Sequence, residues 1–282
     1  MKKLIKKFLN NLAIKRRIKR RLKAIKKYEK NGNIIKIHEE DLIKVNLYLE
    51  NCQNNYIEIK KLSPKAGKIS ISMFADNSKI TIGENYYTID SSFIVGQDHP
   101  NFGKINNVEI SIGDNTSSEN DFSIITYNSN SSVKIGNKCM FAFGITLFNT
   151  DAHPVYDLET NEIINKVDTL EIQDNVWIGA KSTILKNCFI PKGCLVGWNS
   201  VVAKRFSKEN CAIARNPAKV IKENVYWNSN GSQGYIQNDR QTDRQTDRQT
   251  DRQTDRQKVE ILIHLNLLLF TPKYLPNFFL AV

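Results

Sequence analysis

The residue of this chain best suited to acid–base chemistry is His153, which lies in a polar segment between Asp151 and Asp157. Imidazole has an unperturbed pKa of about 6.5, so near neutral pH it can take a proton from an attacking hydroxyl group. Either neighbouring carboxylate could orient the ring, and their spacing alone does not choose between them. His153 is therefore a candidate general base, and a surface-loop histidine without chemistry is the alternative.

The chain has three other histidines, His38, His99 and His264. His99 also precedes a proline and competes with His153 for the role of base, although contact with a substrate suits it better. A three-histidine zinc site of the carbonic anhydrase kind needs three imidazoles that converge on one metal. Because we expect His38 and His264 to lie outside the repeat described next, we expect no metal.

The element that must position these residues is a six-residue repeat. A six-residue period is typical of a parallel β-helix, in which three-sided coils stack and share one core. Three sides make a coil of 18 residues, so Ile172 should stack on Ile190, about 4.8 Å away. The aliphatic positions of the repeat are Ile172, Ile178, Ile184, Ile190, Val196 and Val202. The residues four places after the first five are Val176, Ser182, Cys188, Cys194 and Ser200, and Phe206 breaks the pattern.

The predicted fold class is therefore mainly β, with a parallel β-helix over residues 68–227. Residues 31–67 are expected to form strands that lead into the coils. The polar stretch 149–168 is expected to be a loop that interrupts them, and residues 219–227 a short closing helix. Ile-Gly-polar steps begin at Ile82, Ile112 and Ile135 and suit tight corners, where the backbone often needs a positive φ.

The excess positive charge of the chain lies at its N-terminus. Residues 1–30 hold 14 Lys and Arg against one Glu, whereas the whole chain has a net charge of +12. Apolar residues form two helical stripes, over 4–12 and 14–25, rotated by roughly a quarter to a third of a turn, which a kink near Asn10 would reconcile. We predict a basic amphipathic helix suited to an anionic membrane surface, with packing on its own domain as the alternative. No motif supports binding to nucleic acid.

The C-terminal part has a different composition. Residues 228–258 contain a linker and a tract, 239–257, in which Asp-Arg-Gln-Thr occurs four times before a final partial copy. The tract is neutral and has no apolar face, so we expect it to be disordered. A four-base DNA unit would encode it, and such a unit is prone to slippage. Charged residues and prolines interrupt the apolar tail 259–282, which argues against a membrane span.

The five cysteines show no metal-binding spacing, and the early apolar residues never run long enough for a signal peptide. We expect reduced thiols in a cytoplasmic protein, at the inner face of the membrane if the basic helix binds lipid.

Two runs resemble the hexapeptide-repeat acyltransferases, in the branch of sugar and polysaccharide O-acetyltransferases. They are Asn-Val-Trp-Ile-Gly-Ala at 175–180 and Asn-Pro-Ala-Lys-Val-Ile at 216–221. The resemblance is specific over about residues 135–227 and loose over 68–134. It implies a left-handed β-helix, usually a homotrimer with acetyl-CoA between neighbouring subunits. The activity it implies is O-acetylation of a sugar of a surface glycan, such as capsule or lipooligosaccharide, or of its precursor.

The same resemblance assigns His153 as the base. Trp177 faces outward at a corner, where an intersubunit or ligand contact is favoured, and it matches a tryptophan beside the active site. Gly179 and Ala180 match positions where the backbone contacts the pantetheine arm. Lys204 and Lys219 match basic positions near the CoA phosphates in the family. The alternative is that each is an ordinary solvated surface lysine. The candidate cofactor-binding residues are Trp177, Gly179, Ala180, Lys204 and Lys219, which match the family, and Trp198, which does not.

Two departures from the family pattern fall along the groove expected for CoA. Trp198 and Arg215 stand where the family usually has small residues. Trp198 could stack on CoA, or narrow the groove and weaken binding. Two alternatives to O-acetylation remain, namely N-acetylation of an amino-sugar nucleotide and a non-catalytic β-helix scaffold.

Overall fold

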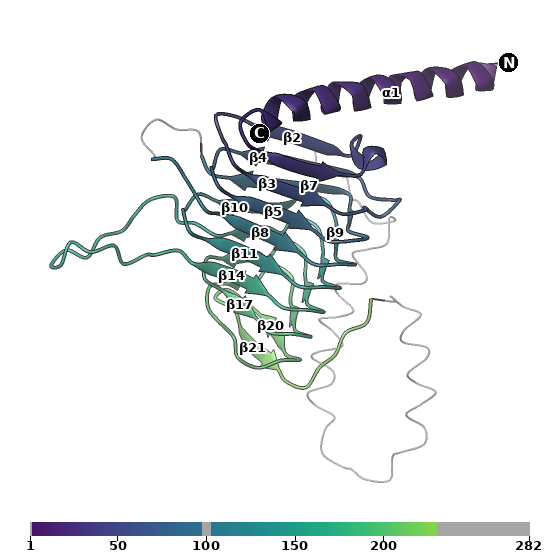
Figure 1. The fold of residues 1–282 in the computed structure, drawn as a ribbon. Helices are drawn as coiled ribbons and strands as arrows, with labels where there is room; N and C mark the ends of the chain where they lie inside the picture. The colour runs from purple at the N-terminus through teal and green to yellow at the C-terminus, as the bar shows by residue number, and fades with distance from the viewer. Residues whose placement is uncertain (1, 98–102, 230–282) are drawn as a thin grey trace, which may run out of the picture. The chain divides into compact units, whose positions relative to one another are not determined.

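The computed structural model describes residues 2–97 and 103–229, with side chains described from residue 12 onward. Up to Trp227, these residues form one compact unit, in which a helix precedes a stack of parallel β-strands (Figure 1). His99, the repeat tract and the apolar tail lie outside the described residues.

The strands of the described residues form three seven-stranded sheets, which we call faces A, B and C in the order in which each coil from Lys79 to Val202 visits them. Face A contains β1 (Ile34–Ile37), β3 (Tyr56–Ile59), β5 (Lys79–Ile82), β8 (Glu109–Ile112), β11 (Ser132–Ile135), β14 (Thr169–Ile172) and β17 (Phe189–Ile190). Face B contains β6 (Tyr87–Thr88), β9 (Ser117–Ser118), β12 (Met140–Phe141), β15 (Trp177–Ile178), β18 (Leu195–Val196), β20 (Ala212–Ala214) and β21 (Lys219–Lys222). Face C contains β2 (Val45–Leu49), β4 (Lys68–Met73), β7 (Asp90–Val95), β10 (Phe122–Thr126), β13 (Thr146–Phe148), β16 (Thr183–Leu185) and β19 (Val201–Val202).

The predicted stacking of the hexads is confirmed. Ile172 pairs with Ile190 on face A. Ile178 pairs with Val196 on face B, and Ile184 pairs with Val202 on face C. All pairs between coils are parallel, apart from the last pair, β20 with β21. The fold is the expected left-handed parallel β-helix.

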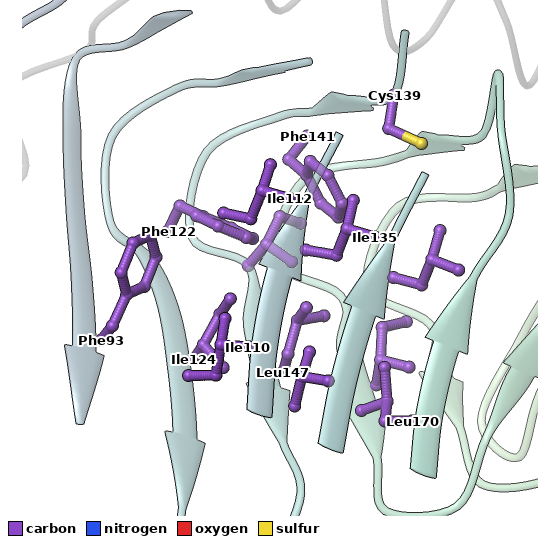
Figure 2. Close-up of a cluster of buried hydrophobic side chains, with 14 of the residues drawn as sticks. Phe93, Ile110, Ile112, Phe122, Ile124, Ile135, Cys139, Phe141, Leu147 and Leu170 are labelled. Carbon is purple, nitrogen blue, oxygen red and sulfur yellow. The ribbon is translucent and has the colours of Figure 1, made fainter. Parts of the chain in front are cut away.

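The core runs the length of this stack because alternate residues of each strand point inward. On β4, for example, Ile69, Ile71 and Met73 are buried, and the residues between them are not. Figure 2 shows the stacked side chains, including an aromatic row in which Phe122 lies between Phe93 and Phe141. Its ring centroid is 6.3 Å from that of Phe93 and 4.7 Å from that of Phe141. Each such side chain contributes about 1.5–3 kcal/mol by leaving water.

The corner between faces A and B explains the Ile-Gly-polar steps. A β-carbon on Gly113 would lie 2.6 Å from the carbonyl carbon of Gly136 in the next coil, so the glycine is required by close approach. The positive φ falls instead on the fourth residue of each step, such as Asn85 (57°) and Asn115 (56°). Asparagine tolerates this conformation better than other side chains do.

The coils begin earlier than predicted. β1 pairs in parallel with β3, and β2 with β4, so the stack starts at Ile34 rather than at residue 68. His38 follows β1 directly and therefore lies within the first coil. The six-residue period hides these coils because paired residues there, such as Ile34 and Tyr56, are 22 positions apart.

The N-terminal helix α1 (Lys2–Glu29) runs without the expected break near Asn10. Its last turns cover the first coil. Tyr28 packs against the core there, and its hydroxyl donates a hydrogen bond to the carbonyl of Leu47 at 3.4 Å. The short 3₁₀ helix η1 (Glu39–Asp41) lies in the same coil, where the carboxylate of Asp41 pairs with Lys44.

The predicted closing helix over 219–227 is wrong. Residues Lys219–Lys222 form β21, which pairs antiparallel with β20. The free edge of β20 offers backbone hydrogen-bond partners that a helix at this place would leave unused. All five cysteines are free and buried, as expected of structural thiols.

Candidate active site

The candidate base lies on the longest excursion from the coils, the loop 149–168 between β13 and β14. The loop leaves at the corner between faces C and A and forms a hairpin with an antiparallel bridge between Tyr156 and Ile163 (Figure 1). Asn149, fully buried, closes its base. The amide nitrogen of Asn149 donates to the carbonyls of Ser132 at 3.1 Å and Asp168 at 3.2 Å.

His153 is exposed near the base of this hairpin, and its backbone is held on both sides. The backbone N–H of His153 donates to the carbonyl of Asp151 at 2.6 Å. The amide nitrogen of Asn165, on the opposite arm, donates to the carbonyl of His153 at 2.9 Å. The position of His153 therefore depends on contacts that span the two arms.

The two carboxylates considered for orienting His153 have different surroundings. Asp151 forms an ion pair with Lys186 at 2.6 Å and accepts from Asn165 at 2.8 Å. Burial raises the pKa of Asp151, but the hydrogen bonds from Lys186 and Asn165 and the charge of Lys186 outweigh burial, so the pKa is lowered overall.

Asp157 instead serves the turn at the tip of the hairpin. Its carboxylate accepts from the backbone N–H groups of Thr160 at 2.9 Å and Glu159 at 3.0 Å. These hydrogen bonds lower its pKa, with that from Thr160 the largest cause. Only Asp151 belongs to the contacts that hold the backbone of His153.

A second group of predicted residues gathers at the corner between faces B and C. The register places Phe143, Ala180 and Trp198 in one column along successive coils. The Trp198 ring meets Phe143 edge-on, with centroids 5.7 Å apart, and Ala180 is 3% exposed. Lys181 lies beside this column, with its ammonium 6.0 Å from the Trp198 ring. The tryptophan that replaces a small family residue thus covers the column.

Gly179 has a structural explanation that involves no ligand. A β-carbon there would lie 2.7 Å from the carbonyl oxygen of Val196 and 2.8 Å from the backbone nitrogen of Trp198. The next coil therefore requires glycine at this position.

Trp177 is on the outer side of face B and is partly covered within the same chain. Trp227 lies 6.1 Å away between ring centroids, and its indole N–H donates to the carbonyl of Asn175 at 2.8 Å. The exposed indole predicted from sequence thus has a partner that sequence did not identify.

The two predicted phosphate-binding lysines lie at different corners. Lys219 pairs with Ala214 at the B–C corner, whereas Lys204 follows β19 at the C–A corner, where its ammonium lies over the Phe206 ring. Arg215, the other departure from the family pattern, has a φ of 92°, which a side chain rarely adopts.

The structure therefore divides the predicted site residues between two corners. Asp151 and its partner Lys186 lie at the C–A corner with His153, while Ala180 and Trp198 lie at the B–C corner. Lys186 stands six positions after Ala180 across face C, which is up to about 20 Å of extended chain. In one copy, the candidate base and the candidate CoA groove therefore stand at different corners of the coils.

Four residues at these corners were not predicted from the sequence, namely Asn165, Lys186, Phe143 and Trp227. Lys186 stands two places after a perfect hexad position, which marks it as a corner residue, but no pattern marked Asn165. Among the described residues, no group of three or more His, Cys, Asp or Glu is placed to hold a metal. Over the same part of the chain, no helix combines the length and apolarity needed to cross a membrane.

Comparison with known proteins gives the family. No protein-family model matches the chain. The polysialic acid O-acetyltransferase of Neisseria meningitidis is 32% identical over 194 residues, which cover 64% of this chain and 89% of that enzyme. The enzyme of the same name from Escherichia coli O1:K1 / APEC is 32% identical over 133 residues, or 47% of this chain and 42% of that enzyme.

Among solved structures, the polySia specific acetyltransferase NeuO is similar with a TM-score of 0.56 and 25% identity. The match covers 71% of this chain and 96% of that one. The chain therefore belongs to the family of the polysialic acid O-acetyltransferases, which are hexapeptide-repeat enzymes, and it is an acetyltransferase.

Proposed function

We propose that this enzyme transfers the acetyl group of acetyl-CoA to a hydroxyl group of an acidic cell-surface glycan, polysialic acid or a close relative. The observation that carries the proposal is the extent of the match with the meningococcal enzyme, 89% of its length. A match of that extent spans a whole catalytic unit, whereas a shared repeat alone would align a few coils.

The distribution of charge supports an anionic acceptor. Residues 166–227 hold ten basic and five acidic side chains, whereas residues 31–165 hold ten basic and seventeen acidic ones. At the B–C corner, Lys181, Arg215 and Lys219 are all exposed. A cationic surface on the last coils would concentrate a polymer with one carboxylate per sugar, and the phosphates of CoA.

In this proposal His153 is the general base. It takes the proton of the acceptor hydroxyl as the oxygen attacks the carbonyl carbon of the thioester. The carbon–sulfur bond then breaks, the acetyl group stays on the sugar oxygen, and the thiolate of CoA takes up the proton. Asp151 acts through the loop backbone rather than on the acceptor, and Asp157 shapes the hairpin tip.

We propose a homotrimer in which the C–A corner of one copy faces the B–C corner of the next. This arrangement would bring His153 to the groove formed by Ala180, Trp198 and Lys219, and Lys204 would line the groove from the other side. The exposed apolar residues of the hairpin would be covered at such an interface. They are Val155, Tyr156, Leu158, Ile163 and Ile164. A preparation that is a monomer by light scattering and still transfers acetyl groups would contradict the trimer.

We also propose that α1 holds the enzyme at an anionic membrane surface, on the cytoplasmic side. Its last turns pack on the first coil, and Leu12, Ile14 and Leu22 are 37–40% exposed. Binding to anionic vesicles should weaken with salt, because exposed charges are screened beyond about 8 Å at physiological ionic strength. Replacement of Lys2, Lys3, Lys6 and Lys7 by Gln should weaken it further, and unchanged binding would refute the role of the helix.

The acceptor is tested by incubating the purified enzyme with acetyl-CoA and polysialic acid oligomers, followed by mass spectrometry. The expected product gains acetyl groups that mild alkali removes, as esters require. Alkali-stable acetylation of an amino-sugar nucleotide instead would favour the N-acetyltransferase alternative. Absence of acetyl-CoA binding would favour a scaffold.

A further inference from the structure

We propose that Asn165 and Lys186 are positioning residues that clamp the loop 149–168 so that His153 stays in place for proton transfer. The inference rests on the proposed role of His153 as the base. Neither residue needs to touch the acceptor or acetyl-CoA, and both act through the loop.

Asn165 uses its whole side-chain amide to join the two arms of the hairpin. Its amide nitrogen donates to the Asp151 carboxylate at 2.8 Å and to the His153 carbonyl at 2.9 Å. Its amide oxygen accepts from the backbone N–H of Val155 at 2.7 Å. The side chain thus holds the residues on both sides of His153 as well as His153 itself.

Lys186 joins this assembly to the rigid coil stack. It directly follows β16, whose residues pair with coils on both sides. Its ammonium donates to the Asp151 carboxylate at 2.6 Å and to the backbone carbonyl of Asn165 at 2.8 Å. Lys186 is 20% exposed and Asp151 40%, so water screens this pair less than a fully exposed one.

The neighbouring Asn187 fixes the returning arm in the same way. Its amide oxygen accepts from the backbone N–H of Asp168 at 2.7 Å, and its amide nitrogen donates to the carbonyl of Lys166 at 2.9 Å. The base of the excursion is therefore anchored independently of Asn165. Loss of Asn165 or Lys186 should loosen the part of the loop around His153 without unfolding its base.

The chemical consequence follows from the demands of proton transfer. A general base must lie within hydrogen-bond reach of the hydroxyl, and a misplacement of about 1 Å can lower the rate about 100-fold. His153 is exposed on a loop, and the polar contacts of Asn165 and Lys186 hold the backbone around it.

The test compares isosteric and conservative variants in the full-length enzyme. Asn165→Asp keeps the acceptor for Val155 but replaces the donor with a second carboxylate beside Asp151. Lys186→Met removes the ammonium, and Lys186→Arg keeps the charge. We expect Asn165→Asp and Lys186→Met to lower kcat about 10- to 100-fold, with Tm and the KM for acetyl-CoA nearly unchanged. Lys186→Arg should restore much of kcat.

Two exposed positions on the same loop provide matched controls, Asn161→Asp and Lys166→Met. Both should retain wild-type kcat. Hydrogen–deuterium exchange gives a readout that does not depend on activity. The peptide around residues 150–166 should exchange faster in Asn165→Asp and Lys186→Met than in the wild-type enzyme, and at the wild-type rate in the two controls.

His153→Ala, measured alongside, separates the two proposals. If His153→Ala keeps its activity, the base assignment fails. If His153→Ala is inactive but Asn165→Asp and Lys186→Met keep wild-type kcat, the clamp is wrong while the base stands. A fall in Tm that accounts for the loss of activity would also overturn the clamp, because the role would then be stability alone.

Discussion

The two corners that carry the candidate site are built on different principles. At the B–C corner, Gly179 and Ala180 are held by backbone atoms and rings of the adjacent coils. At the C–A corner, His153 is held through polar side chains, of which Asn165 and Lys186 make the central contacts. Changes at the first corner should therefore affect folding, and changes at the second should affect catalysis with little effect on folding.

Loss of the base should produce the largest effect. His153→Ala should lower kcat by about 100-fold or more, the usual weight of general-base catalysis, while Tm stays the same because the side chain is exposed. Steady-state kinetics and thermal unfolding of the same preparation measure both. His99→Ala is the matched control and should lose much less. Equal losses for the two variants would mean that the base has been misidentified.

The opposite behaviour is expected at the B–C corner. Gly179→Ala places a β-carbon within 3 Å of three backbone atoms of the next coil, and these cannot move without disturbing the stack. We expect a loss of about 1–3 kcal/mol in the free energy of unfolding, the usual cost of overpacking. Urea unfolding measures it. Gly103→Ala, where a β-carbon would meet nothing within 4 Å, should be neutral. A neutral Gly179→Ala would mean that the glycine is kept for a ligand instead.

The difference between the corners also explains what sequence could predict. Ile178 and Val196 were paired correctly because each inward side chain needs a partner one coil away, and the 18-residue coil states where that partner is. The earlier coils are longer, so Ile34 and its partner Tyr56 fell outside the period. The contacts of Asn165 join residues across a loop that has no period, so only three-dimensional structure reveals them.

The last strand shows a further limit of local sequence. Lys219–Lys222 resembles a short helix on local pattern, yet it forms β21 because β20 presents an open edge. Tertiary context overrides weak local preference in short segments of this kind. The same reversal of the chain forces Arg215 to a φ of 92°.

That strain gives a smaller, stabilising prediction at the B–C corner. Arg215→Gly should relieve a conformation that costs a side chain about 1–2 kcal/mol, less the entropy that glycine adds to the unfolded chain. We expect Tm to rise by about 2–4 °C per kcal/mol gained, as calorimetry would show. Arg215→Ala is the control, because it removes the charge and keeps the β-carbon. A gain with Ala equal to that with Gly would assign the effect to charge.

The smallest effect is expected from acid at the C–A corner. The folded pKa of Asp151 lies below its ordinary value of 3.8, because the contacts with Lys186 and Asn165 favour the carboxylate over the opposing effect of burial. A group with a lowered folded pKa adds stability above its unfolded pKa and loses it as the pH falls through the folded value. The hairpin should therefore loosen at a pH below about 4, before the coils unfold. Hydrogen exchange of the loop across that range, compared with that of the strand peptides, measures the difference.

Asp151→Asn should show a loop that is already loose at neutral pH and that changes little on acidification, since it lacks the charge that Lys186 binds. If the loop and strands of the wild-type enzyme loosen together, the two corners are one cooperative unit, and the contrast between stacked and clamped residues does not hold.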